Sequence, residues 1–301
     1  MDHKTFLSTL SPTQRETLTA RSDVKGIMHL VGHWGAIVLC SSLIVQSAPV
    51  WQLVLIVQGV LLVFLFTLLH ETSHKTPFRS GWINDVVGHV CGFLLLLPAT
   101  WFRYFHFAHH RFTQIPGKDP ELEAPKPTTW AQYISHISGI PVWISHIKTL
   151  LRNALGQQQY AYVPKARVNQ ITKEARVYLL GYAILFSVSV WQSTPVLFFV
   201  WLLPMLLGQP FLRLYLLAEH GRCPAVVDMF KNTRTTFTNR LVRAIAWNMP
   251  YHTEHHSYPS VPFHRLPDLH RLIEPHLSVT ASSYTAFNKD YILESVKSSK
   301  S

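Results

Sequence analysis

Four stretches of the chain lack charged residues and are long enough to cross a lipid bilayer. Ile27–Gln46 and Val50–Leu69 each run for about 20 residues without Asp, Glu, Lys or Arg. At about 1.5 Å per residue, such a helix matches a hydrocarbon core of about 30 Å. Val177–Thr194 and Pro195–Leu212 form a second uncharged pair, and the turn within each pair is very short. The sequence therefore predicts four transmembrane helices arranged as two hairpins.

A fifth apolar stretch, Val86–Phe102, is shorter and contains Gly88, Gly92 and Pro98. The 27 Lys and Arg residues lie before the first hairpin, between the hairpins and after the second one. The positive-inside rule then places the N-terminus, the middle loop and the C-terminus in the cytosol. Because that topology leaves no room for a fifth crossing, we expect Val86–Phe102 to form a re-entrant or interfacial helix. The polar residues 1–26 do not resemble a secretory signal.

Composition excludes several classes of protein. Hydrophobic residues make up 48% and charged residues 14% of the chain, against about 25% charged residues in a soluble domain. The net charge of +11 accompanies no arginine-rich helix or aromatic-basic module, so nucleic-acid binding is not expected. The three cysteines are widely spaced and contain no CxxC pair, which excludes a disulfide scaffold or a cysteine-zinc module.

Half of the 18 histidines fall into four clusters. HETSH begins at residue 70, HFAHH at residue 106 and HTEHH at residue 252, and a single histidine follows the fourth span in AEHG, at residue 220. Imidazoles at i, i+3 and i+4 share one helix face and offer several nitrogen donors to one point, which is typical of a metal site. The four-span topology places all four clusters on the same side of the membrane. The other histidines are expected to be structural: His3, His29, His33, His89, His136, His146, His264, His270 and His276.

With these histidine clusters, called boxes from here on, the sequence resembles the membrane fatty acid desaturase and hydroxylase superfamily from about Gly26 to His270. The segment 251–267, YHTEHHSYPSVPFHRLP, is most similar to acyl-lipid desaturases of the bacterial and sphingolipid type. The resemblance implies one desaturase-like domain over residues 1–301. Residues 1–26 would be a cytosolic segment, 27–217 the membrane helices and middle loop, and 218–301 a cytosolic helical cap and tail. No HPGG signature of a fused cytochrome b5 domain is present.

The resemblance also implies a diiron site with dioxygen as co-substrate. Asn248 would reach one metal through water, and Glu71, Glu219 and Glu254 would fix the tautomers of ligand imidazoles. The implied iron ligands are His70, His74, His106, His109, His110, His220, His252, His255 and His256.

The implied activity is desaturation of an acyl chain or acyl-derived lipid by successive C–H abstraction. Two alternatives lie within the superfamily, namely a hydroxylase and a carotenoid hydroxylase or ketolase. A rival from another class is an intramembrane zinc metalloprotease, because HETSH also satisfies H-E-x-x-H with Glu71 as general base. A metal carrier is a third alternative, but its ligands would be expected in mid-membrane rather than at helix ends.

The electrons for such a reaction must come from outside the chain, because three scattered cysteines cannot hold an iron–sulfur cluster that normally takes four. We expect ferredoxin, or cytochrome b5 with its reductase, to dock on the cytosolic face. The predicted docking residues lie between His220 and the last box: Arg222, Lys231, Arg234, Arg240 and Arg243.

Overall fold

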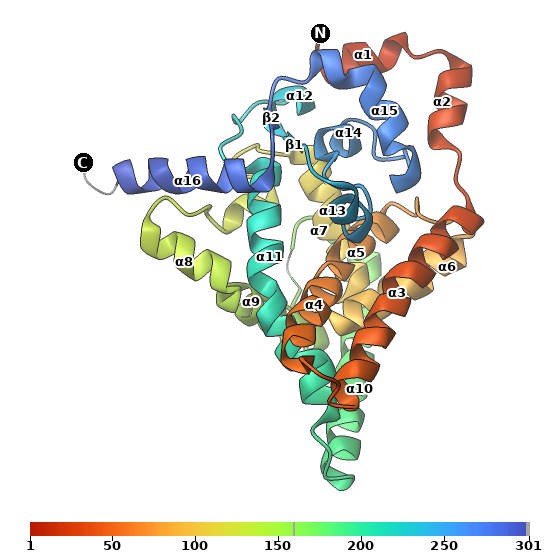
Figure 1. Cartoon of the computed structure of the whole chain (residues 1–301). Helices are drawn as coiled ribbons and strands as arrows, with labels where there is room; N and C mark the ends of the chain where they lie inside the picture. The colour runs from red at the N-terminus through yellow and green to blue at the C-terminus, as the bar shows by residue number, and fades with distance from the viewer. Residues whose placement is uncertain (159, 299–301) are drawn as a thin grey trace.

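The computed structural model describes residues 1–158 and 160–298, and its regular structure is almost entirely helical (Figure 1). The first half of the chain forms α1 (His3–Thr9), α2 (Pro12–Thr19), α3 (Asp23–Val45), α4 (Trp51–Val63), α5 (Leu65–Ser73), α6 (Gly81–Leu94), α7 (Ala99–Phe112), α8 (Trp130–Ser138) and α9 (Ile140–Ala154). The second half forms α10 (Val168–Trp191), α11 (Leu203–His220), α12 (Met229–Asn232), α13 (Arg240–Ile245), α14 (His252–Ser257), α15 (Leu266–Ile273) and α16 (Tyr284–Ser298). Short helical turns are η1 (Pro120–Glu123), η2 (Lys165–Arg167), η3 (Phe198–Leu202), η4 (Phe263–Arg265) and η5 (Glu274–His276), and β1 (Thr235–Thr236) pairs in parallel with β2 (Thr280–Ala281). The all-α prediction is confirmed.

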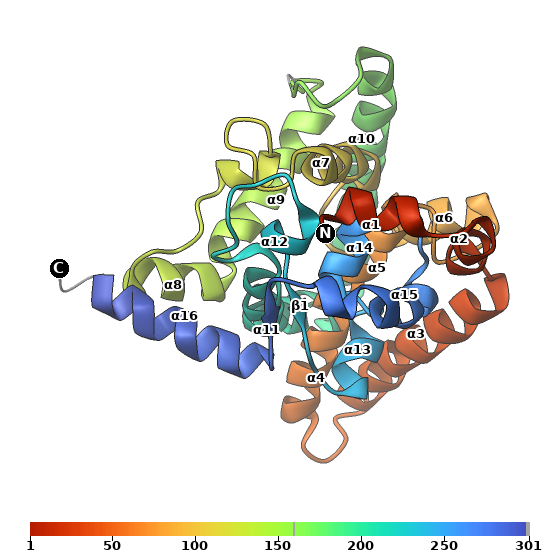
Figure 2. The ribbon, with the colours of Figure 1, turned by 90° about the horizontal axis from the view of Figure 1, so that it is seen from above.

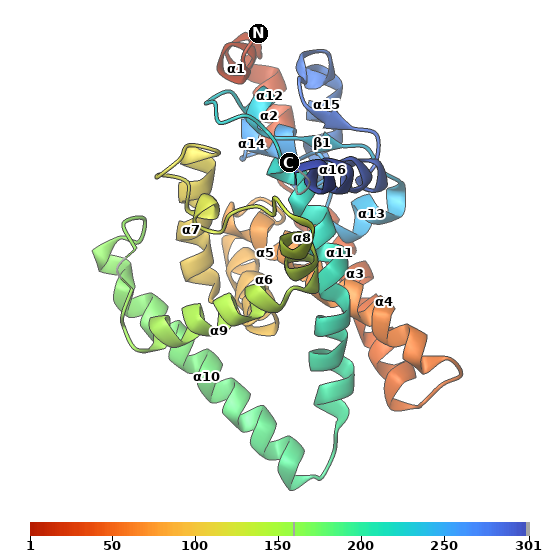
Figure 3. The same cartoon turned by 90° about the vertical axis from the view of Figure 1, so that its left-hand side faces the viewer.

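Among the residues that the structure describes, three helical segments are long and apolar enough to cross a membrane, namely Pro12–Val45, Trp51–Ser73 and Phe198–His220. They overlap the first, second and fourth predicted spans. The third predicted span overlaps α10, which begins nine residues earlier than expected. This helix carries Lys173, Glu174 and Arg176 within its first nine residues. Figure 3 shows α10 and α11 meeting at a turn far from the termini, and α3 and α4 forming a second hairpin.

The second and fourth spans approach each other closely where both carry glycine. A Cβ atom on Gly59 would lie 2.2 Å from the carbonyl oxygen of Pro204, and one on Gly208 would lie 2.2 Å from the carbonyl oxygen of Gly59. Small residues allow this approach between membrane helices, where dispersion contacts and hydrogen bonds replace the hydrophobic effect as the driving force. Pro204 cannot donate to the carbonyl of Val200, and the side chain of Gln58 donates to that oxygen at 2.9 Å instead. The glycine and prolines of the fourth span thus serve helix packing.

The fifth apolar stretch does not continue as a straight helix. α6 and α7 meet at an angle of 99° around residues 95–98, so the chain turns back toward the second histidine box. Such a bend interrupts the regular helical hydrogen bonds, and side chains of other helices contact the backbone carbonyls around it. Tyr182 donates to Phe93 O at 2.7 Å, Trp201 donates to Leu94 O at 2.9 Å, and a ring nitrogen of His146 lies 3.1 Å from Leu95 O. Irregular backbone at membrane depth is tolerated where it is enclosed by protein in this way.

The segment after α11 covers the ends of the spans together with the N-terminal helices (Figure 2). His3 ties α1 to this cap through Asp228, at 3.2 Å. Trp247 is fully buried and donates from its ring to His33 at 3.1 Å, and His33 in turn contacts the carbonyl of Leu61 at 2.9 Å. His3 and His33 are structural, as expected.

Candidate metal centre

Four helices bring the nine candidate histidines to one place beneath the cap. The end of α5 supplies His70, and His74 follows as its C-cap. One face of α7 supplies the second box, the last residue of α11 is His220, and α14 supplies the third box. These segments are far apart in sequence, so only the tertiary fold joins them. All nine predicted ligand positions lie in this cluster.

Five of the rings form one group, in which each residue offers a nitrogen within 4.8 Å of the others'. Nε2 of His74 lies 2.8 Å from Nε2 of His106, and Nε2 of His255 lies 3.2 Å from Nε2 of His110. The ring of His70 packs against those of His106 and His255, with centroids 4.1 and 4.5 Å away. Both its nitrogens are buried without a hydrogen-bond partner in the described part of the chain. The members are His70, His74, His106, His110 and His255.

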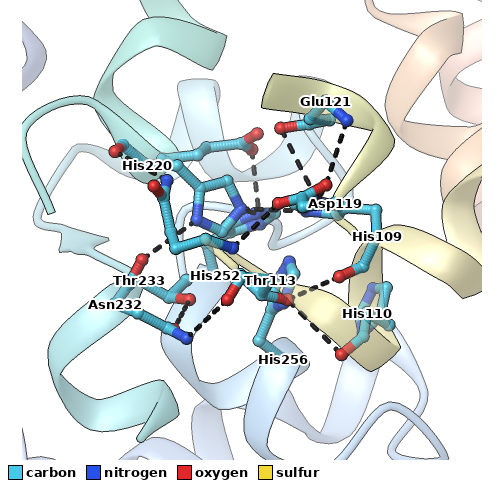
Figure 4. A network of polar contacts seen from close by, with 12 residues as sticks. His109, His110, Thr113, Asp119, Glu121, His220, Asn232, Thr233, His252 and His256 are labelled. Atoms are coloured by element: carbon cyan, nitrogen blue, oxygen red, sulfur yellow. Dashed lines mark hydrogen bonds and ion pairs between the residues drawn. The ribbon is translucent and has the colours of Figure 1, made fainter. Parts of the chain in front are cut away.

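A second group consists of His109, His220 and His256, again with nitrogens within 4.8 Å of one another (Figure 4). Nε2 of His109 lies 3.2 Å from Nε2 of His220. The ninth ring, His252, extends this group, because its Nε2 lies 3.1 Å from that of His220. Its centroid is 6.0 Å from that of His70, so it lies between the two groups.

The outward nitrogens of several rings face acceptors. Nδ1 of His255 lies 3.3 Å from a carboxylate oxygen of Glu71, and Nδ1 of His252 lies 3.4 Å from one of Glu219. An acceptor at Nδ1 keeps the proton there and leaves the Nε2 lone pair free toward the centre of the cluster. Each glutamate therefore faces a histidine of the third box, although its neighbour in the sequence is His70 for Glu71 and His220 for Glu219.

Three further acceptors are not predicted by the box pattern (Figure 4). Asp119 is 3% exposed, and its carboxylate lies 2.9 Å from Nδ1 of His109. The backbone carbonyl of Asn232 lies 3.2 Å from Nδ1 of His220. Thr113 donates its hydroxyl proton to the carbonyl of His109, so the same oxygen can accept from Nδ1 of His256 at 3.2 Å. Three of the nine rings thus have a hydrogen-bond acceptor at Nδ1, and two more have a carboxylate oxygen within 3.4 Å of it.

The environment of α14 favours neutral imidazoles. Burial, followed by the charges of neighbouring histidines, holds the pKa of His252, His255 and His256 well below 6.5. The neutral ring is the form that binds a metal. The donors present therefore fit two metal ions, one in each group, with the enclosed and unpartnered nitrogens as the binding atoms.

One expectation about a residue near the boxes is wrong. Glu254 does not contact a candidate ligand: it accepts from Thr235 at 2.6 Å and pairs with His270. Asn248 donates from its amide nitrogen to the carbonyl of Phe263 at 3.0 Å, and its contact with a metal through water stays a prediction. Adjacent helical residues point about 100° apart, so a neighbour of a ligand in sequence need not support that ligand.

The predicted docking patch also needs correction. Arg234 is 7% exposed and donates to the carbonyls of Ala218 and Gly221 at the end of α11. A cation there satisfies carbonyls that the helix leaves unpaired. Arg243 donates to the Tyr251 hydroxyl at 2.6 Å.

Comparison with known protein families matches residues 10–288 to the fatty acid desaturase family. The chain belongs to this family. The match covers both predicted hairpins and all four histidine clusters, so the desaturase resemblance read from the boxes is confirmed. The buried histidine groups are those of a desaturase-family protein, and this family is known to use iron.

Individual desaturases show similarity at low identity. An sn-1 oleoyl-lipid 12-desaturase of Picosynechococcus sp. is 24% identical over 72% of this chain and 66% of its own length. A dihydrorhizobitoxine desaturase of Bradyrhizobium elkanii is 24% identical over 87% of this chain and 79% of its own length. A sphingolipid delta(4)-desaturase/C4-monooxygenase of Mus musculus is 26% identical over 69% of this chain and 60% of its own length.

Proposed function

We propose that this desaturase-family protein removes two hydrogens from neighbouring carbons of an acyl chain in a membrane lipid, using dioxygen and two iron ions. The observation that carries the proposal is the convergence of nine histidines into a group of five and a group of three with His252 beside it. The proposed ligands are therefore the nine residues predicted from the boxes. The irons would supply the oxidising power that an unactivated C–H bond requires.

The chain's own residues prepare this site. Asp119 accepts from Nδ1 of His109 and so aims its Nε2 inward. Glu71 and Glu219 place a carboxylate oxygen 3.3 and 3.4 Å from the outward Nδ1 atoms of two α14 histidines. Seven of the nine rings are less than 9% exposed, which excludes water from the cluster. Phe102 stacks on the ring of His106, with centroids 5.5 Å apart, and Phe66 packs against Phe102. An apolar wall therefore borders the group of five on the side of α5 and α7, as an acyl chain requires.

Lipid profiling of cells with and without the protein tests the reaction. Desaturation predicts a product two mass units lighter than its precursor, and a His255→Ala variant should not form it. A product sixteen mass units heavier would instead support hydroxylation, which we keep as the second candidate because the mouse relative is named a desaturase/C4-monooxygenase. Cells whose lipids do not change with expression of the protein would contradict both.

The geometry around Glu71 argues against the zinc protease. The carboxylate is fully buried, and one oxygen accepts from Thr76 at 3.1 Å and from the backbone N–H of Phe263 at 3.2 Å. The other oxygen faces His255. A general base needs an oxygen directed at a metal-bound water, whereas one oxygen of Glu71 accepts two hydrogen bonds and the other lies 3.3 Å from Nδ1 of a candidate ligand.

We place the termini and the metal centre on the cytosolic side. In Figure 3, α9 runs across the direction of α11, as a helix lying along a membrane surface would. An exposed apolar stripe follows α8 and α9, with side chains 46–66% exposed at Trp130, Ile134, Ile140, Ile144, Ile147, Leu151 and Leu155. A stripe of this length on in-plane amphipathic helices fits the head-group boundary of a bilayer.

Cysteine labelling tests the sidedness. Ser47 and Ser193 lie in the two short turns and are exposed, and so is Lys118 in the loop after α7. A membrane-impermeant reagent should label Ser47→Cys and Ser193→Cys from outside, and Lys118→Cys only after permeabilisation. External labelling at Lys118 would contradict the placement.

We propose that the electron donor is ferredoxin or cytochrome b5 with its reductase. Of the predicted docking residues, Arg222, Lys231 and Arg240 are exposed, and Arg222 is ion-paired with Glu294. Charge steering acts mainly on the association rate. Reversing Lys231 and Arg240 to Glu should slow donor-limited turnover at low salt without changing iron content. Unchanged turnover at limiting donor would reject this surface.

A further inference from the structure

The outer face of α7 carries positive charge and aromatic rings beside the group of five histidines. Arg103, Phe107 and Arg111 follow one another at intervals of four residues and therefore share one side of the helix. Phe107 is 37% exposed, and the guanidinium of Arg103 lies over its ring, 5.2 Å from the centroid. The ring of Phe107 also packs against that of His74, with centroids 5.5 Å apart. A single side chain therefore separates this face from a candidate metal ligand.

The metal centre is least covered at this face. Seven of the nine candidate rings are buried, whereas His74 and His110 are only half-buried. His74 contacts Phe107, and His110 directly precedes Arg111 in the sequence. The outer face of α7 thus borders the two candidate ligands that solvent can reach.

The positive charge continues into the loop after α7. Arg111 lies over the ring of Phe112, 5.2 Å from its centroid, and Lys118 lies over the same ring at 5.8 Å. In residues 1–158 and 160–298, no carboxylate lies within ion-pair distance of Arg103, Arg111 or Lys118. Like charges gathered without counter-ions repel one another, and such a surface attracts partners of opposite charge.

The exposed cation of α12 lies at the edge of this face. Lys231 precedes Asn232, whose amide nitrogen donates to the carbonyl of Thr113 at 3.2 Å. The helix α7 itself lies on the cap side of α9, which we place along the membrane surface (Figure 3). In that orientation the basic face is directed toward the cytosol and not toward the bilayer. Arginine and aromatic side chains are also enriched in the centre of protein interfaces.

The proposed reaction requires a partner that brings electrons to this part of the molecule. Dioxygen becomes two waters when the lipid gives up two hydrogen atoms and a donor supplies two electrons, with two protons from solvent. Contacts between electron-transfer proteins are usually small, so one helix face and the adjoining loop are sufficient. We propose that Arg103, Phe107, Arg111, Phe112 and Lys118 form the surface on which an acidic electron-carrier protein docks. The choice of partner rests on the proposed function.

Binding measured without turnover tests this surface. The protein is placed in phosphatidylcholine nanodiscs and titrated separately with ferredoxin and with cytochrome b5. Combining Arg111→Glu with Lys118→Glu should weaken the Kd of the donor about tenfold at low salt, and the difference should disappear at about 1 M salt. Iron content should not change. Arg21→Glu with Lys289→Glu alters the net charge equally at exposed positions away from α7, and this control should bind like the wild type (Figure 2).

Wild-type affinity of the Arg111→Glu, Lys118→Glu variant for the donor would overturn the inference, and so would a wild type that binds neither donor. Equal weakening in the control variant would show that only net charge matters. Weakening confined to nanodiscs that contain phosphatidylglycerol would assign these cations to the lipid surface. Either result would also contradict the docking surface. A protein that binds its donor through this face but leaves cellular lipids unchanged would contradict the proposed reaction and support the surface.

Discussion

Asp119 offers the sharpest test of how the protein prepares its metal ligands. Its carboxylate accepts from His109 at 2.9 Å and from the backbone N–H groups of Gln114 and Glu121 at 2.8 and 3.0 Å. These hydrogen bonds hold the pKa of Asp119 below its usual range, although burial acts in the opposite direction. The group is therefore an ionised acceptor that fixes the proton of His109 at Nδ1.

Replacing Asp119 with Asn keeps the shape of the side chain and removes its charge. The amide loses a charge-assisted hydrogen bond worth about 1.5–3 kcal/mol, and its NH2 group can instead face Nδ1 and move the ring proton to Nε2. Supporting residues of this kind typically account for about 10- to 100-fold in metal affinity. Because His109 belongs to the group of three, only one of the two metals should be weakened.

Iron content measured against increasing chelator concentration reads out this difference. The wild type should lose both irons at similar chelator concentrations, whereas Asp119→Asn should lose one about 10- to 100-fold earlier and keep the other. Glu121→Gln is the control, because its carboxylate is 3.8 Å from Nδ1 of His109 and partly exposed. If Asp119→Asn retained both irons as the wild type does, the proposed role of Asp119 would be wrong.

Three other outcomes follow from the structure. His255→Ala should abolish turnover and lower iron content. His29→Ala should retain both, because a ring nitrogen of His29 lies 2.7 Å from the carbonyl of Ala244, outside the metal centre. Equal activity of the two variants would contradict the ligand assignment. Gly208→Val should lower the free energy of unfolding, measured by thermal unfolding in detergent, by about 1–3 kcal/mol through overpacking. Gly35→Val should change that free energy little, because a side chain at this position meets open space. The metal-free protein should lose stability as the pH falls below 6.5, because the histidines of α14 bind protons more readily in the unfolded chain than when buried. A melting temperature independent of pH between about 5 and 7 would contradict this.

The sequence was sufficient to predict the histidine set, because each box places its rings on one helix face through local spacing alone. The same is true of the uncharged stretches, whose length fixes their helical character. The bend at residues 95–98 could also be anticipated, since glycine, proline and the distribution of charge all disfavoured a straight crossing.

Long-range partners could not be predicted in the same way. Asp119 and Asn232 lie in loops that reach the metal centre only after α7 and α11 have packed, and their spacing from the boxes carries no signal. Arg234 was wrongly assigned to the surface because net charge does not distinguish a solvated cation from one that binds carbonyls at a helix end. Glu254 was misassigned because proximity in sequence was taken for proximity in space.

Metal analysis of the purified full-length protein tests the central claim most directly. Nine converging histidines in two groups predict about two irons per chain, with both lost in a variant that combines His255→Ala and His220→Ala. One zinc per chain, or iron that remains bound in that double variant, would contradict the account.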